Sequence, residues 1–173
     1  MTLITNKIDY KKLSRTSLNG KRVYQCPDGS AVASVTTILD ATKDKTHLME
    51  WRKRVGEEVA NKIARQASGR GTAVHKLCED YIDNKEDYAK KAQPSNMLMF
   101  NDMKQVIDKR IDNIYFQECY LFSDQLKTAG QVDCIAEFDG ELSVIDFKTS
   151  KRPKTEDKIQ SYFMQVAFYA AAF

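Results

Sequence analysis

A turn signal, Asp139-Gly140, lies between two apolar runs and constrains the fold of this chain more than any other feature. The runs cover about residues 132–138 and 141–148 and are rich in valine, isoleucine, phenylalanine and leucine. An Asp-Gly pair between such runs is typical of a two-residue β-hairpin. The sequence therefore predicts two adjacent antiparallel strands in the last third of the chain.

Counting outward from this turn places Asp133 opposite Asp146. Opposed residues of an antiparallel pair have Cβ atoms about 4.5–5.5 Å apart, and like charges there are destabilising. A divalent cation between the two carboxylates would remove that penalty. Lys148 follows Asp146 by two residues, so its side chain leaves the strand on the same face. Two carboxylates and an amine around a metal ion point to phosphodiester chemistry.

Each of these side chains also has a purely structural interpretation. Asp133 and Asp146 could be surface carboxylates, but each has apolar neighbours in a strand, where an unpaired carboxylate is costly. Hard carboxylate oxygens suit Mg²⁺ or Mn²⁺. Lys148 could form a salt bridge with Asp146, orient an attacking water or stabilise charge in the transition state, and these roles are compatible.

Composition fits one globular domain with a sizeable core. The chain has 173 residues, of which 42% are hydrophobic and 29% charged, and a net charge of +3, so nucleic-acid binding would require local clusters of cations. No segment has the pattern of a signal peptide or a membrane helix, so we expect a cytoplasmic protein (the bacterial host cytoplasm if it is phage-encoded). The four cysteines are far apart with no CxxC pair, which favours buried free thiols over a metal–thiolate site.

The pattern along the chain predicts helices, then strands, then a helix. We expect a lead-in over 1–35 with a turn at 27–30, and a short helix with Ser34 or Thr36 as its cap. Further helices are expected over about 48–67, 72–83, 95–115 (with Ser95 as its cap) and 158–173, and strands over about 118–122, 132–138 and 141–148. Gly69 and Gly71 should break the helical region. Three consecutive strands indicate an antiparallel meander in a layered α/β (α+β) domain, with helices on both faces.

His75 lies at the edge of the apolar stripe of its expected helix. A lone histidine is more often packed or hydrogen-bonded than catalytic, but Arg70 and Gly71 precede it, and such a helix start favours phosphate. Glu79, one turn further on, could orient His75, accept a hydrogen bond from a metal-bound water, or be a solvated carboxylate.

Two further groups lie after the predicted hairpin. Lys151, Arg152 and Lys154 form either a solvated loop or a clamp for phosphates. Gln165 and Tyr169 are four residues apart on one helix face, where they could pack in the core, brace the hairpin or contact a DNA strand.

Four short motifs occur in order: Gly71 to His75 (GxxxH), Gly130 to Asp133 (GxxD), Asp146 to Lys148 (DxK) and Gln165 to Tyr169 (QxxxY). Together they resemble the RecB-like branch of the PD-(D/E)XK nuclease superfamily. Residues 34–39, Trp51 and residues 70–75 are also similar to the mitochondrial genome maintenance exonuclease group and its phage-encoded relatives.

The resemblance implies a metal-dependent exonuclease that acts on DNA, with a preference for single-stranded ends. It implies Asp133, Asp146, the Phe147 carbonyl and His75 as ligands of one or two Mg²⁺ or Mn²⁺ ions, with no iron–sulfur cluster. Lys148 would position the attacking water, and Gln165 and Tyr169 would support the site and contact nucleic acid. Alternatives are an endonuclease of the same fold and a weakly active or inactive fragment that binds nucleic acid or a partner.

The resemblance also implies a restriction-endonuclease-like α-β-β-β-α core, with helices on both faces of a small mixed sheet. The chain ends in the second core helix, so the final core strand of that fold is absent. We therefore expect one domain over 1–173, truncated at the C-terminus, with a lead-in (1–35), a helical part (36–116) and a catalytic sheet and helix (117–173). A second polypeptide or a swapped element would complete the sheet.

Overall fold

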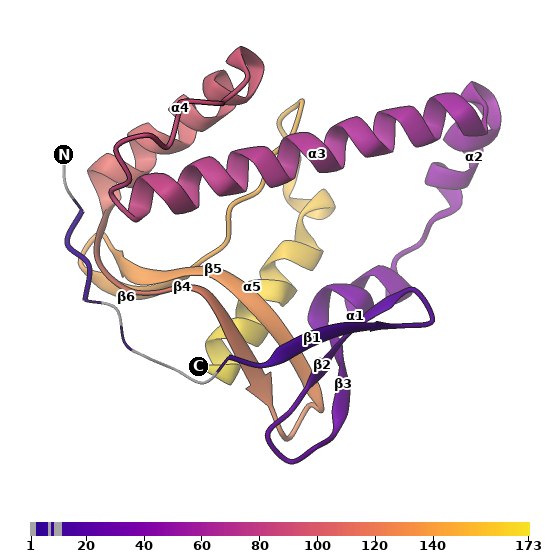
Figure 1. Ribbon diagram of the computed structural model, residues 1–173. Helices are drawn as coiled ribbons and strands as arrows, with labels where there is room; N and C mark the ends of the chain where they lie inside the picture. Colours follow the sequence, from indigo (N-terminus) through magenta and orange to yellow (C-terminus); the bar gives the residue numbers. More distant parts are fainter. Residues whose placement is uncertain (1–2, 7, 9–11) are drawn as a thin grey trace.

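The computed structural model describes residues 3–6, 8 and 12–173, so part of the predicted lead-in (1–2, 7 and 9–11) lies outside the described residues (Figure 1). Its elements, in chain order, are β1 (Ser14–Leu18), β2 (Lys21–Gln25), β3 (Ala31–Ser34), α1 (Val35–Thr42), α2 (Thr46–Val55), α3 (Glu57–Ile82), α4 (Pro94–Arg110), β4 (Ile111–Ser123), β5 (Thr128–Phe138), β6 (Glu141–Ile145), the 3-10 helix η1 (Glu156–Lys158) and α5 (Gln160–Ala172). This mixed α/β architecture confirms the predicted fold class.

Strand β5 is the centre of the sheet. It is antiparallel to β4 on one side, while on the other its first residues pair in parallel with β3 and its last residues pair antiparallel with β6. The strand order is β1-β2-β3-β5-β4, with β6 attached to β5. The predicted meander β4-β5-β6 is therefore confirmed, and β1 to β3 extend it into a mixed sheet.

The predicted hairpin register is also confirmed. Asp139 and Gly140 have φ values of 54° and 83°, as a turn with two left-handed positions requires. The ladder runs from the Phe138–Glu141 pair outward to the Cys134–Ile145 pair. Strand β6 ends at Ile145, earlier than predicted.

Helices cover both faces of the sheet, each over its own hydrophobic cluster. Figure 1 shows α3 lying across one side of the sheet, beside α4. The cluster beneath them includes Val74, Leu77, Phe100, Ile107 and Cys134. On the opposite face α1 and α5 pack over a cluster that includes Val35, Leu121, Val132, Phe168 and Tyr169.

The predicted helix break at Gly69 and Gly71 is wrong. Helix α3 is continuous from Glu57 to Ile82, and the break lies at Gly56, whose φ of 85° favours glycine. A glycine inside a helix costs only about 1 kcal/mol, and the burial of Val74 and Leu77 in the second half of α3 outweighs that cost.

The boundary between α4 and β4 also differs from the prediction. Helix α4 begins at Pro94, with Gln93 rather than Ser95 as its N-cap residue, and it ends at Arg110. Residues 111–115, predicted as helical, begin β4, where Ile111 and Ile114 are buried. The prediction of Ser34 as a helix cap is confirmed, because its hydroxyl accepts a hydrogen bond from the Thr37 N–H at 3.1 Å.

The cysteines are free and buried, as predicted, and they belong to three separate hydrophobic clusters. Within the described ranges, no helix has both the length and the apolar character needed to cross a membrane.

Candidate active site

A cavity of about 440 Å³ opens between α3 and the adjacent ends of β5 and β6. It gathers six of the predicted site residues from three parts of the chain: His75, Glu79, Asp133, Asp146, Lys148 and Gln165. Its other lining residues are Arg15, Arg22, Gly71, Thr72, Lys76, Glu118 and Gln131. Arg70, Lys151, Arg152, Lys154 and Tyr169 do not line this cavity.

Asp133 is held at one carboxylate oxygen. The Phe147 N–H, just beyond the end of β6, donates to Oδ2 of Asp133 at 2.7 Å, and Nδ1 of His75 lies 3.4 Å from the same oxygen. The hydrogen bond to Asp133 raises the pKa of His75 above its ordinary value, against the opposing effect of burial. The backbone after β6 thus turns inward to fix a carboxylate, which explains the early end of the strand.

Asp146 is more deeply buried, with a side chain only 5% exposed. Burial, reinforced by the negative charge of Asp133, raises the pKa of Asp146, while the ion pair with Lys148 opposes that rise. Nζ of Lys148 also lies 5.5 Å from the centre of the Tyr162 ring. The two buried acids repel one another and would gain from a bound cation.

Helix α5 fixes Asp146 through a short chain of hydrogen bonds. Nε2 of Gln165 donates to Oδ1 of Asp146 at 3.1 Å and to the Tyr169 hydroxyl at 3.0 Å. The Tyr169 hydroxyl donates to the Gln131 carbonyl at 2.8 Å. The four-residue spacing of the QxxxY motif puts both side chains on one helix face, where they connect Asp146, just after β6, with Gln131 of β5.

The glycine of the GxxD motif has a steric explanation. A Cβ atom at Gly130 would lie 2.6 Å from Cε1 of Tyr169 and 3.1 Å from Cγ1 of Val35. Only glycine lets α5 approach β5 this closely. Tyr169 itself is 1% exposed, so its ring offers almost no surface to a ligand in this structure, and its contact with nucleic acid stays a prediction.

Glu118 is a cavity residue that sequence reasoning missed. In a regular strand Gln117 and Glu118 would face opposite sides. In β4 the φ of Glu118 is 50°; Gln117 donates to the Glu79 carbonyl of α3 at 3.0 Å, and Glu118 lines the cavity beside α3. Burial, with the charges of Asp133 and Glu79, raises the pKa of Glu118 to about 7.

Arg15 and Arg22 were also missed, because the sequence of the lead-in does not indicate which strand of the sheet this segment pairs with. They come from β1 and β2 and line the cavity, and Nη1 of Arg15 donates to Oε1 of Gln131 at 3.3 Å. They add two cations at the mouth of a cavity whose floor is acidic.

Glu79 lines the cavity, but its carboxylate pairs with Lys76 at 2.9 Å, and among the described residues it has no bond to His75. The phosphate-binding helix start expected at Arg70 and Gly71 does not exist, because both residues lie within α3. Lys151, Arg152 and Lys154 lie in the exposed segment between β6 and η1, and the Lys154 amine contacts the Tyr162 hydroxyl.

The donor set of the cavity suits a hard divalent cation, because Asp133 and Asp146 offer carboxylate oxygens next to the Phe147 backbone. His75 lines the same cavity, and its Nδ1 lies 3.4 Å from Oδ2 of Asp133. Among the described residues, three metal-binding side chains have their ligand atoms within 4.8 Å of one another only at Glu79, Asp80 and Asp83. Lysines neutralise that acidic group, since Lys76 binds Glu79 and Asp80, and Lys85 binds Asp80 and Asp83.

Comparison with known proteins finds a family match over the C-terminal part of the chain. The family described as "PD-(D/E)XK nuclease superfamily" matches residues 105–173, which contain the hairpin, the GxxD and DxK motifs and α5. With the fold, this match confirms for residues 105–173 the resemblance to the PD-(D/E)XK nuclease superfamily that the motifs predicted.

The chain is also similar to proteins named mitochondrial genome maintenance exonuclease 1. It is 30% identical to the protein from Homo sapiens over 155 residues, which is 83% of this chain and 44% of the relative. It is 29% identical to the protein from Xenopus tropicalis over 151 residues, or 82% of this chain and 43% of the relative. The chain therefore spans less than half the length of these relatives.

Proposed function

We propose that this chain is a divalent-metal-dependent deoxyribonuclease that hydrolyses phosphodiester bonds at the ends of single-stranded DNA. The observation that carries the proposal is the convergence of Asp133, Asp146 and Lys148 in one cavity, with both carboxylates held by protein N–H groups. The similarity to proteins named as exonucleases supports action on ends.

In this proposal Asp133, Asp146 and the Phe147 carbonyl would hold Mg²⁺ or Mn²⁺. His75 would be a ligand of a second metal position next to this one. When bound, the ion polarises the scissile phosphate and lowers the pKa of a coordinated water. Gln165 and the Phe147 N–H keep the two carboxylates in place, so little reorganisation is needed during the reaction. Lys148 orients the attacking water and offsets negative charge on the phosphate.

Cations around the cavity would receive the DNA backbone. Arg15 and Arg22 line the cavity, and Lys151, Arg152 and Lys154 follow the catalytic strand in an exposed segment. We include Gln165 as a contact because it lines the cavity, whereas Tyr169 acts by positioning Gln165.

The deciding experiment is a cleavage assay on end-labelled linear and on circular single-stranded DNA, with Mg²⁺ or Mn²⁺ and with EDTA. We expect degradation of linear DNA only, lost in EDTA and in Lys148→Ala. Cutting of circles would replace the exonuclease by an endonuclease. Binding without cleavage under either metal would replace it by a binding module.

We also propose that a second polypeptide or a swapped element pairs with the free edge of β6. Among the described residues β6 pairs with β5 alone, and Leu142 in this strand is exposed. An unpaired strand edge is a template for another strand. A light-scattering mass that corresponds to a soluble monomer would contradict this part of the proposal.

A further inference from the structure

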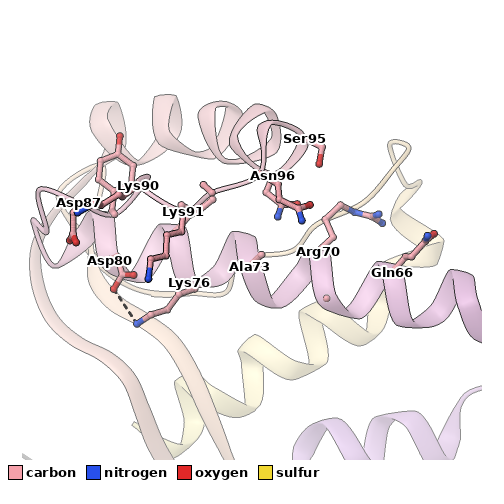
Figure 2. A pocket seen from close by; sticks show the side chains of 15 residues that line it. Gln66, Arg70, Ala73, Lys76, Asp80, Asp87, Lys90, Lys91, Ser95 and Asn96 are labelled. Atoms are coloured by element: carbon pink, nitrogen blue, oxygen red, sulfur yellow. Dashed lines mark ion pairs between the residues drawn. The ribbon is translucent and has the colours of Figure 1, made fainter.

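A second and larger cavity, of about 920 Å³, lies against a different face of α3 (Figure 2). Its walls are α3, the segment between α3 and α4, and the first turn of α4. Lys76 lines both this cavity and the catalytic one. The two cavities are therefore neighbours across one helix, and we call this one the α3–α4 cavity.

Positive charge dominates the α3–α4 cavity. Its lining has four cationic side chains, Arg70, Lys76, Lys90 and Lys91, and two carboxylates, Asp80 and Asp87. Asp80 is already neutralised by Lys76 at 3.1 Å and by Lys85. Within the described part of the chain, no carboxylate forms an ion pair with Arg70, Lys90 or Lys91.

Two polar side chains of this cavity, Asn96 and Arg70, are buried at least in part. Asn96, a polar residue that is only 8% exposed, also lines this cavity. Nε of Arg70 is buried and has no hydrogen-bond partner among the described residues. Figure 2 shows Arg70 and Asn96 at the same end of the cavity, one reaching from α3 and the other from α4. Leaving a buried N–H donor such as Arg70 Nε unsatisfied costs about 1–3 kcal/mol, so its place beside Asn96 indicates a missing ligand.

The ligand must be an anion with several acceptor atoms. The Arg70 guanidinium and the Asn96 amide both supply N–H donors. The first turn of α4 has no acidic residue, and its N-cap residue Gln93 makes no side-chain capping bond, so the positive end of the helix dipole also faces this end of the cavity. A phosphate group satisfies all of these donors at once.

We propose that the α3–α4 cavity binds a phosphate of the same DNA strand whose end occupies the catalytic cavity. This inference rests on the proposed function. It identifies the substrate as a strand long enough to cross α3, with Lys76 between the two cavities. Free phosphate or a mononucleotide has the same chemistry, and the length of the bound DNA distinguishes these sources.

The test is fluorescence anisotropy in EDTA, with labelled oligothymidylates of about 4 and about 16 nucleotides. For Arg70→Gln we expect about tenfold weaker binding of the long strand and unchanged binding of the short one. The salt slope should fall by about 0.7 for the lost phosphate contact. Asn96→Ala should act in the same direction. Lys109→Gln is the matched control, because Lys109 is exposed at the far end of α4 and lines neither cavity.

Equal weakening of both strand lengths, or of neither, would overturn the proposal. A second result would also overturn it: in Arg70→Gln, inorganic phosphate stabilises the protein less in thermal unfolding, while binding of the long strand is unchanged. The cavity would then be a site for free phosphate. Circular dichroism shows whether the variants are folded, and Arg70→Lys should recover part of the affinity. A chain that binds the long strand through Arg70 but cleaves nothing would refute the nuclease while leaving this inference in place.

Discussion

The two cavities beside α3 differ in how their charges are satisfied. In the catalytic cavity the charged groups bind one another: His75 lies against Asp133, and Lys148 pairs with Asp146. In the α3–α4 cavity, Nε of Arg70 is buried without a hydrogen-bond partner among the described residues, and Arg70, Lys90 and Lys91 form no ion pair with a described carboxylate. One helix thus separates a cavity with two neighbouring carboxylates from a cavity with unpaired cations, an arrangement that would suit the proposed metal ion on one side and a DNA phosphate on the other.

The largest expected effect is on the acidic side of this comparison. Asp146→Asn removes one buried carboxylate and should lower metal-dependent cleavage by at least about 10³-fold, or roughly 4 kcal/mol in the barrier. The measurement is the initial rate of release of labelled nucleotide in Mn²⁺. Asp139→Asn, at the exposed hairpin turn, is the control and should leave the rate unchanged. Comparable rates for wild type and Asp146→Asn would contradict a role of this cavity in cleavage.

The second effect concerns the support of the catalytic cavity from α5. Gly130→Ala places a methyl group against the Tyr169 ring and Val35, and should lower the free energy of unfolding by about 1–3 kcal/mol. Urea unfolding measures this change. Tyr169→Leu in the Gly130→Ala background removes the ring and should make the alanine less costly. Independent, additive effects would contradict the close packing.

The third effect is a dependence of stability on pH without metal. The pKa values of Glu118 and Asp146 are raised in the folded protein, so both acids bind protons more tightly there than in the unfolded chain. Their contribution to stability is therefore lost as pH rises. The raised pKa of His75 has the same sign, because stabilisation at low pH disappears as the folded histidine deprotonates.

In EDTA, the free energy of unfolding should therefore fall between about pH 5 and pH 8. Glu118→Gln should make the fall smaller, and Mg²⁺ or Mn²⁺ should stabilise the protein most at the higher pH. Urea titrations at both pH values test this. Stability that rises with pH in EDTA would show that the acids are not held in the unfavourable environment described above.

The smallest effect is on the glycine that lines only the α3–α4 cavity. A Cβ atom at Gly69 meets no atom within 4 Å, and the residue lies inside a helix. Gly69→Ala should therefore stabilise the protein by about 0.5–1 kcal/mol in urea unfolding. Gly56→Ala is the contrast and should destabilise it, because the φ of Gly56 is 85°. A loss of stability in Gly69→Ala would point to a real break in α3 at that residue.

Local chemistry was sufficient to predict the parts of the site set by short-range rules. The Asp139-Gly140 turn determines the register of β5 and β6, and with it the meeting of Asp133 and Asp146. The spacing of Gln165 and Tyr169 defines a single helix face.

Features that depend on packing between distant segments could not be read from the sequence. The strands that carry Arg15 and Arg22 join the sheet through two residues of β3 paired with β5. Glu118 reaches the cavity because its φ is left-handed inside a strand, and a glutamate in the sequence does not predict a positive φ. The continuity of α3 through two glycines reflects tertiary burial of its second half.

Lys76 and the unbroken course of α3 have one more consequence. Arg70 and His75 are five residues apart on one helix, which separates their Cα atoms along its axis by about 7.5 Å. Because an α-helix has a fixed rise per residue, the distance between the two proposed binding positions, at Arg70 and at His75, is fixed. A DNA strand bound at both proposed positions would therefore present an equivalent phosphodiester bond to Asp133 and Asp146 each time it advances.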